Sequence, residues 1–168
     1  MLNNLPIATK VLLILNSLLF LIKILLAQFG IAELSVVMGS FYPESVNFYL
    51  WQPLTHLFMH AGFAHILFNM FALVMFGATV ERILGTKRFL ILYFIAGLGA
   101  FLLFNAQSYF AITELKRAVS DLGLNPDFVN ESMKLDLMGM ATVPRIFSEI
   151  PEIEALANAY ITPMVGAS

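Results

Sequence analysis

The sequence contains no cysteine, which excludes disulfide bonds, iron–sulfur clusters and thiolate metal sites. Charged residues are also scarce: they make up 12% of the 168 residues, against about 25% in an average soluble domain. The formal net charge of −2 is small, which argues against a nucleic acid as partner. Hydrophobic residues, by contrast, make up 60% of the chain. This composition is typical of an integral membrane protein.

Three apolar runs predict transmembrane helices at residues 11–29, 62–84 and 89–105, since a helix needs roughly 20 apolar residues to cross a bilayer. The first run also resembles the apolar region of a secretory signal peptide, but it is long for one and no clear A-x-A site follows. Lys23 interrupts this run, so its side chain must reach the interface or face other helices. The sequence therefore predicts an all-α, polytopic membrane helical bundle.

The distribution of cations predicts the orientation of the bundle. The turn between the second and third runs carries Arg82, Lys87 and Arg88, whereas residues 30–60 contain no lysine or arginine. By the positive-inside rule, that turn is cytoplasmic and residues 30–60 lie on the outer side. We expect residues 30–52 to form a loop whose aromatic side chains anchor it at the interface.

Residues 107–160 differ in character, because they contain eight of the eleven acidic residues. They predict an extra-membrane insert with several short helices. Asn125 followed by Pro126 is typical of a helix N-cap and first turn, and Gly139 is expected to end a helix. The simplest interpretation is a connection whose amphipathic helices rest on the membrane. The small and apolar residues 162–168 predict the start of a fourth span.

The histidines of the chain, His56, His60 and His65, lie within ten residues at the start of the second apolar run, and Asn69 follows them. Polar side chains are costly in a bilayer and are therefore candidates for a functional site. On a helix, His65 and Asn69 lie about 40° apart and share a face, whereas His60 lies about 140° from His65. We expect Ala61-Gly62 to break the helix, so that His60 approaches from the preceding loop.

Three interpretations of this cluster remain open from spacing alone. A histidine and an asparagine on one helix face can donate hydrogen bonds into a cavity, as an oxyanion hole requires. His56 and His60 are spaced to share a metal ion, but residues 45–80 contain no carboxylate or thiol to complete the site. In the third interpretation, these side chains satisfy one another and the backbone without chemistry.

Ser168 is a candidate nucleophile, because it follows the small residues Gly166 and Ala167. Small neighbours let a substrate approach, and a helix N-terminus favours negative charge. The triplet alone is weak evidence, because small residues are common wherever membrane helices pack.

Together these motifs resemble the rhomboid family of intramembrane serine proteases. The resemblance covers about Trp51 to Ala106 and resumes at Gly166. The family pattern His-x4-His-x3-Asn falls on His60, His65 and Asn69, Gly-x3-Glu-x3-Gly on Gly77, Glu81 and Gly85, and Gly-x-Ser on Gly166 and Ser168.

The resemblance implies an intramembrane serine endopeptidase that cleaves transmembrane segments of membrane proteins, with no metal or organic cofactor. It implies that Ser168 is the nucleophile and opens the fourth helix of a six-helix core. His65, Asn69 and the Ser168 N–H would stabilise the tetrahedral oxyanion. Supporting roles would fall to His60, Gly166 and Glu81, the last of these by tying helix ends together.

The chain departs from the family pattern in ways that limit this inference. The family's general base is a histidine on the sixth helix, whereas every histidine here precedes Ser168. We therefore expect residues 1–168 to be one rhomboid-like membrane domain that is truncated at the nucleophile, and inactive alone. The outer-loop pair Trp-Arg reads Trp51-Gln52, which leaves the anchoring of that loop open. The insert at 107–160 is also longer than in minimal bacterial members.

The expected location is a bacterial inner (plasma) membrane, with the active site open to the outer side. The expected partners are the lipid bilayer and transmembrane protein substrates. One alternative is a catalytically inactive rhomboid-like protein for membrane-protein binding or quality control. Another is a small transporter or metal-handling protein that uses the histidine cluster.

Overall fold

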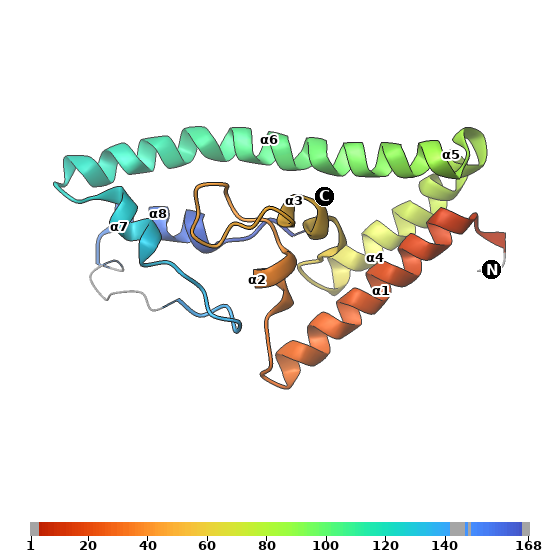
Figure 1. Ribbon diagram of the computed structural model, residues 1–168, viewed down its shortest axis with the longest axis horizontal. Helices are drawn as coiled ribbons and strands as arrows, with labels where there is room; N and C mark the ends of the chain where they lie inside the picture. Colours follow the sequence, from red (N-terminus) through yellow and green to blue (C-terminus); the bar gives the residue numbers. More distant parts are fainter. Residues whose placement is uncertain (1–3, 142–146, 148, 166–168) are drawn as a thin grey trace.

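The computed structural model describes residues 4–141, 147 and 149–165, and the long regular elements in this part of the chain are all helices. Three helical stretches are long and apolar enough to cross a membrane: α1 (Ile7–Gln28), the stretch Phe63–Leu84, and α6 (Thr86–Asp121). The predictions of an all-α fold and of three spans are confirmed. Figure 1 shows α1 and α4 side by side and diverging from α6, with the shorter helices in the opening between them.

The second span is one continuous stretch with a change of helix type in its middle. It consists of α4 (Phe63–Ala72), the π-helix η3 (Leu73–Gly77) and α5 (Ala78–Leu84). Short π-helical segments inside α-helices are frequent at functional sites. Gly85 then turns the chain into α6 with φ +80°, a conformation that side chains with a Cβ rarely adopt.

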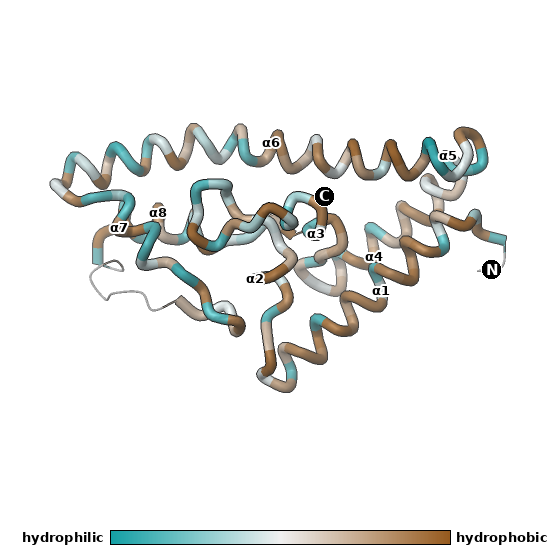
Figure 2. The backbone as a smooth tube through the Cα atoms, viewed as in Figure 1, coloured by the Kyte–Doolittle hydropathy of each residue, from teal (hydrophilic) through white to brown (hydrophobic). Residues whose placement is uncertain are grey.

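The third span belongs to a longer helix than predicted. The apolar run ends at residue 105, but α6 continues without a break to Asp121. Figure 2 shows mostly hydrophobic residues in the half of α6 near α5 and a mixture in the half near α7. Residues 106–121 include three alanines and the long charged side chains of Glu114, Lys116 and Arg117, which favour helix. The first part of the insert is therefore an extension of the membrane helix.

The segment 30–52 was predicted to be a loop, but it contains a helical turn, α2 (Leu34–Met38). The Glu33 carboxylate caps this turn by accepting a hydrogen bond from the Ser35 N–H at 3.2 Å. The chain then reaches α3 (Gln52–Thr55) and the 3₁₀-helix η2 (His56–Phe58).

Two further helices lie in the insert, α7 (Pro126–Glu131) and α8 (Pro151–Ile161). The predicted cap is confirmed, since the Asn125 side chain accepts a hydrogen bond from the Asp127 N–H at 3.0 Å. The prediction that Gly139 ends a helix is wrong. Gly139, at φ +75°, lies in a turn closed by an isolated bridge between Leu135 and Ala141.

The insert encloses a second hydrophobic core. Side chains from α6 and from the loop between α2 and α3 also contribute to it. Its buried members are Tyr42, Ile112, Val119, Val129, Met133, Phe147, Ile153, Leu156, Ala157 and Tyr160. Because side chains of α6, α7 and α8 meet in this core, the insert is a packed subdomain. The helices of the insert therefore pack on one another, and their expected position on the membrane surface stays a prediction.

Hydrogen bonds from buried side chains join the insert to the loop between α2 and α3. Asn47 is 2% exposed; its Nδ2 donates to the Met133 carbonyl at 2.7 Å, and its Oδ1 accepts from the Leu135 N–H at 2.9 Å. Ser45 donates through Oγ to the Tyr160 carbonyl at 2.8 Å. The loop that leads to the histidines is thus held by the insert.

We predict that Asn47→Ala lowers the free energy of unfolding by about 1–3 kcal/mol, because it leaves the buried Met133 carbonyl and the part-buried Leu135 N–H without partners. Denaturant or thermal unfolding in detergent measures the loss. Asn158→Ala is the matched control, because Asn158 is exposed on α8. Equal stability of the two variants would contradict the prediction.

Candidate functional site

The helix break predicted at Ala61-Gly62 is confirmed, because α4 begins directly after it. Gly62 has an extended backbone, with φ −163° and ψ −177°. His60 therefore precedes the helix, while His65 and Asn69 lie one turn apart on α4. The rings of His60 and His65 pack edge to face, with 5.2 Å between their centroids. The structure thus brings the predicted residues together at the start of the second span.

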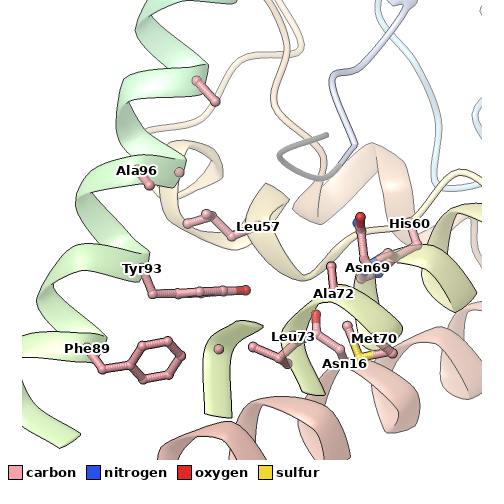
Figure 3. Close-up of a pocket in the computed structure, with 13 residues that line it drawn as sticks. Asn16, Leu57, His60, Asn69, Met70, Ala72, Leu73, Phe89, Tyr93 and Ala96 are labelled. Atoms are coloured by element: carbon pink, nitrogen blue, oxygen red, sulfur yellow. The ribbon is translucent and has the colours of Figure 1, made fainter. Parts of the chain in front are cut away.

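A cavity of about 480 Å³ lies between α1, the α4–η3 stretch and α6. Four polar side chains line it: Asn16, His60, Asn69 and Tyr93. Figure 3 shows Tyr93 reaching from α6 into this space. His65 is not part of the lining, so it is His60 that joins Asn69 at the cavity surface.

The rest of the cavity wall is apolar and contains many small residues. Its members are Leu57, Met70, Ala72, Leu73, Gly77, Phe89, Ala96, Gly97 and Ala100. Gly97 allows η2 to approach α6 closely, since a Cβ at this position would lie 2.9 Å from Leu57 Cγ. Walls of this kind admit another backbone or a peptide segment at short distance.

Two of the polar residues, Asn16 and Tyr93, were missed from the sequence. Asn16 is 1% exposed; its Nδ2 donates to the Leu12 carbonyl at 2.7 Å, and its Oδ1 has no partner within the described residues. A lone asparagine in an apolar run was a usable signal, because a membrane helix rarely buries an amide without a function or a partner. Tyr93 gave no such signal, because its direction depends on how α6 packs.

His56 has a structural environment rather than that of a metal ligand. Its side chain is fully buried, its Nδ1 lies 3.1 Å from the Gln52 carbonyl oxygen, and its ring packs against Phe101. Across residues 4–141, 147 and 149–165, no group of three histidine, aspartate or glutamate side chains is placed to hold a metal ion. The shared-metal interpretation of His56 and His60 is therefore not supported.

Gln52 anchors the loop between α2 and α3. Its side chain is fully buried; Oε1 accepts from the Tyr49 N–H at 3.0 Å, and Nε2 donates to the Asn47 carbonyl at 3.1 Å. A neutral amide with both ends paired costs little to bury. Gln52 thus anchors the loop through a neutral amide, and the cation that holds the same loop comes from the insert, where Lys134 donates to the Val46 carbonyl at 2.8 Å and to Tyr49 Oη at 2.9 Å.

Glu81 lies at the other end of the second span and joins three helices. It is 2% exposed, and its two oxygens accept from the Ala8 N–H at 2.9 Å, the Thr9 N–H at 2.7 Å, Thr9 Oγ1 at 2.8 Å and Thr86 Oγ1 at 2.8 Å. The first N–H groups of a helix have no partners within that helix. Since Pro6 supplies no side-chain cap, Glu81 caps α1 from α5.

Burial lowers the pKa of His56 and of His60, because both side chains lose the water that stabilises the charged form. In the unfolded chain these groups titrate near pH 6.5. The unfolded state therefore binds more protons than the folded state as the pH falls below about 6.5. We predict full stability above that pH and a loss between it and the lower folded-state pKa values.

Thermal unfolding in detergent between pH 5 and 8 measures this dependence. His56→Gln should flatten the profile, since it removes one of the two groups while keeping a side chain that can bond to the Gln52 carbonyl. If the pH dependence of the unfolding temperature is as steep in His56→Gln as in the parent protein, His56 does not contribute to it.

The candidate nucleophile Ser168 and its neighbour Gly166 lie outside the described residues. The segment that leads to them is described: Met164 donates to the Ser40 carbonyl at 2.7 Å, and the Ser40 N–H donates back at 2.9 Å. The predicted fourth span begins in this segment, but its described part, residues 162–165, is not helical.

The fold and the cavity define a polytopic membrane protein with a polar site among its spanning helices. Residues 47–113 match the family model of the Rhomboid domain, and this segment contains His60, Asn69 and Glu81. This segment of the chain is therefore similar to the Rhomboid domain.

Curated relatives carry the same family name. The chain is 44% identical over 43 residues to "Putative rhomboid protease YdcA" of Bacillus subtilis (strain 168), which covers 26% of this chain and 22% of that protein. It is 46% identical over 48 residues to "Rhomboid protease GluP" of the same organism, covering 29% and 10%. It is 34% identical over 93 residues to "Rhomboid-like protease 1" of Toxoplasma gondii, covering 55% and 31%.

The aligned parts thus span between a tenth and a third of these relatives' lengths. No solved structure matches the chain.

Proposed function

We propose that this protein is an intramembrane serine endopeptidase that cleaves transmembrane segments of other membrane proteins. The observation that carries the proposal is the meeting of His60 and Asn69 at one cavity between apolar helices, made possible by the break at Ala61-Gly62. Several relatives named as rhomboid proteases support the same reaction class. Ser168 is the proposed nucleophile.

His65 and Asn69 are the proposed oxyanion donors. His65 Nδ1 accepts a hydrogen bond from the Ala61 N–H at 3.4 Å, so the ring proton of the neutral histidine lies on Nε2. Among the described residues, that Nε2 has no partner. A histidine held in this tautomer is a hydrogen-bond donor, which favours oxyanion stabilisation over general-base catalysis.

The proposed general base is a histidine outside these 168 residues, because His65 is a proposed donor, His60 a proposed supporting residue, and His56 lies against Gln52 and Phe101. In the proposed reaction, that base takes the proton of the Ser168 hydroxyl while the alkoxide attacks the scissile carbonyl. In the proposal, the oxyanion receives hydrogen bonds from Asn69 Nδ2, which lines the cavity, and from His65 Nε2, which lies outside the lining and has to turn toward it. The protonated base then gives its proton to the leaving amide nitrogen. Water finally hydrolyses the acyl-enzyme.

The proposed location is a bacterial inner membrane, with the site near the outer face. The exposed cations Arg82, Lys87 and Arg88 lie at the α5–α6 turn, at the opposite end of the second span from His60. The positive-inside rule supports a cytoplasmic turn.

The test is labelling with a serine-directed fluorophosphonate, applied in membranes to the protein as its gene encodes it. We expect labelling that Ser168→Ala abolishes and that Ser120→Ala, at an exposed position of α6, leaves unchanged. Cleavage of a transmembrane substrate should follow the same order. Equal labelling of Ser168→Ala and the parent would overturn the assignment and favour a non-enzymatic rhomboid-like protein that binds membrane proteins.

A further inference from the structure

Lys23 is a cation within the first membrane span, and its side chain is only 14% exposed. A buried ammonium group is costly unless it is paired, and its three N–H donors need acceptors. A lysine one and a half turns from the end of a span is able to extend to the interface instead. Because Lys23 stays buried, the contacts of its ammonium group indicate its role in the structure.

The shortest polar contact of Lys23 is with the backbone of His60, just before the Ala61-Gly62 break. Its Nζ donates to the His60 carbonyl oxygen at 2.9 Å, whereas the Glu33 carboxylate lies 3.8 Å away. The ammonium group is thus closer to a neutral carbonyl than to the opposite charge. Charge neutralisation alone does not explain this geometry, because a lysine that served only the ion pair would approach the carboxylate.

The carbonyl that Lys23 binds lies where the chain changes direction before the second span. Residue 60 is the last before the Ala61-Gly62 break, and α4 begins directly after that break. The His60 side chain is 2% exposed, lines the cavity and packs against Phe20 of α1, with 6.4 Å between the ring centroids. α1 thus holds both the backbone and the ring of His60.

We propose that Lys23 is a positioning residue, whose ammonium group fixes the His60 carbonyl and with it the geometry of the histidine cluster at the cavity. The inference rests on the proposed function for its catalytic consequence. No family motif quoted above includes Lys23, and its position in α1 lies outside the segment that matches the family model.

Electrostatics supports the same role. The titratable groups that face His60 are His65 from α4 and Lys23 from α1, and both lower its pKa in addition to the larger effect of burial. Burial is the main reason that the pKa of His60 is lowered, and the Lys23 charge adds to it, while a backbone hydrogen bond at Phe58 opposes both. A neutral ring packs against Phe20 and His65 without the cost of a buried charge.

The activity test uses Lys23→Met and Lys23→Arg in the protein as its gene encodes it. Lys23→Met should lower kcat about 10- to 100-fold with little change in KM, because a displaced site costs rate rather than binding. Lys23→Arg should restore most of the loss, since arginine also donates to a carbonyl. Glu33→Gln is the matched control and should stay near the parent, because the carboxylate is the more distant partner. A Lys23→Met enzyme with the parental kcat would overturn the proposal.

A second readout does not depend on catalysis. Hydrogen exchange of the segment 58–62 should be faster in Lys23→Met than in Glu33→Gln, and the His60 titration followed by NMR should shift to higher pH. Unchanged exchange and titration in Lys23→Met would overturn the proposal, whatever the activity. Shifts of both in a protein that fluorophosphonates never label would retain the contact and reject the protease function instead.

Discussion

Asn69→Ala is expected to lower kcat for cleavage of a transmembrane substrate about 10²- to 10³-fold, with little change in KM. Asn69 lines the cavity on the same face of α4 as His65, so its amide is placed to donate to an oxyanion. A donor of this kind interacts more strongly with the transition state than with the uncharged substrate carbonyl, and its loss therefore appears in kcat.

The chain offers a close control in Asn105→Ala. Asn105 is also an asparagine on a membrane helix, but its Nδ2 donates to the Phe101 carbonyl of its own helix at 2.8 Å. It is not part of the cavity lining. Steady-state kinetics in detergent or liposomes should separate the two variants by at least about tenfold. An equal loss in both would show that the effect arises from helix packing and not from the oxyanion.

The second large effect is expected for Glu81→Ala, which should lower the free energy of unfolding by about 3–5 kcal/mol. The carboxylate accepts four hydrogen bonds, and its removal leaves the Ala8 and Thr9 N–H groups without partners at the buried start of α1. Glu81→Gln should cost less, because the amide oxygen still accepts.

Chemical unfolding in detergent measures both losses, with Glu114→Ala as the control, since Glu114 is exposed on α6. Glu81→Ala should also increase hydrogen exchange of residues 7–10, where the capped N–H groups lie. Stability equal to that of Glu114→Ala would mean that the four hydrogen bonds contribute nothing net.

Several features of the fold could be predicted from residues that are close to one another in the sequence. The Ala61-Gly62 break and the Asn125 cap depend on residues within one helical turn, and both occur where they were predicted. The three spans follow from long apolar runs. Each of these features is decided by side chains close to one another in the chain.

Features that depend on distant partners were not predictable from the sequence. Hydropathy falls after residue 105 and so predicts the end of the span, but it does not predict that the next turns of α6 continue as helix and pack against the insert. A helical wheel places His65 and Asn69 on one face, but it does not say that His60 replaces His65 at the cavity. Likewise, Lys23 was recognised as costly, whereas its acceptor lies 37 residues away.

The unbroken length of α6 has a mechanical consequence. Its 36 residues correspond to about 54 Å, against about 30 Å for the hydrocarbon core of a bilayer. One half carries Tyr93 and Gly97 at the cavity, and the other carries Ile112 and Val119 in the core of the insert. Because nothing between them breaks the helix, we expect a tilt imposed on the insert to alter the width of the cavity. α6 would then act as a lever between the core of the insert and the candidate site.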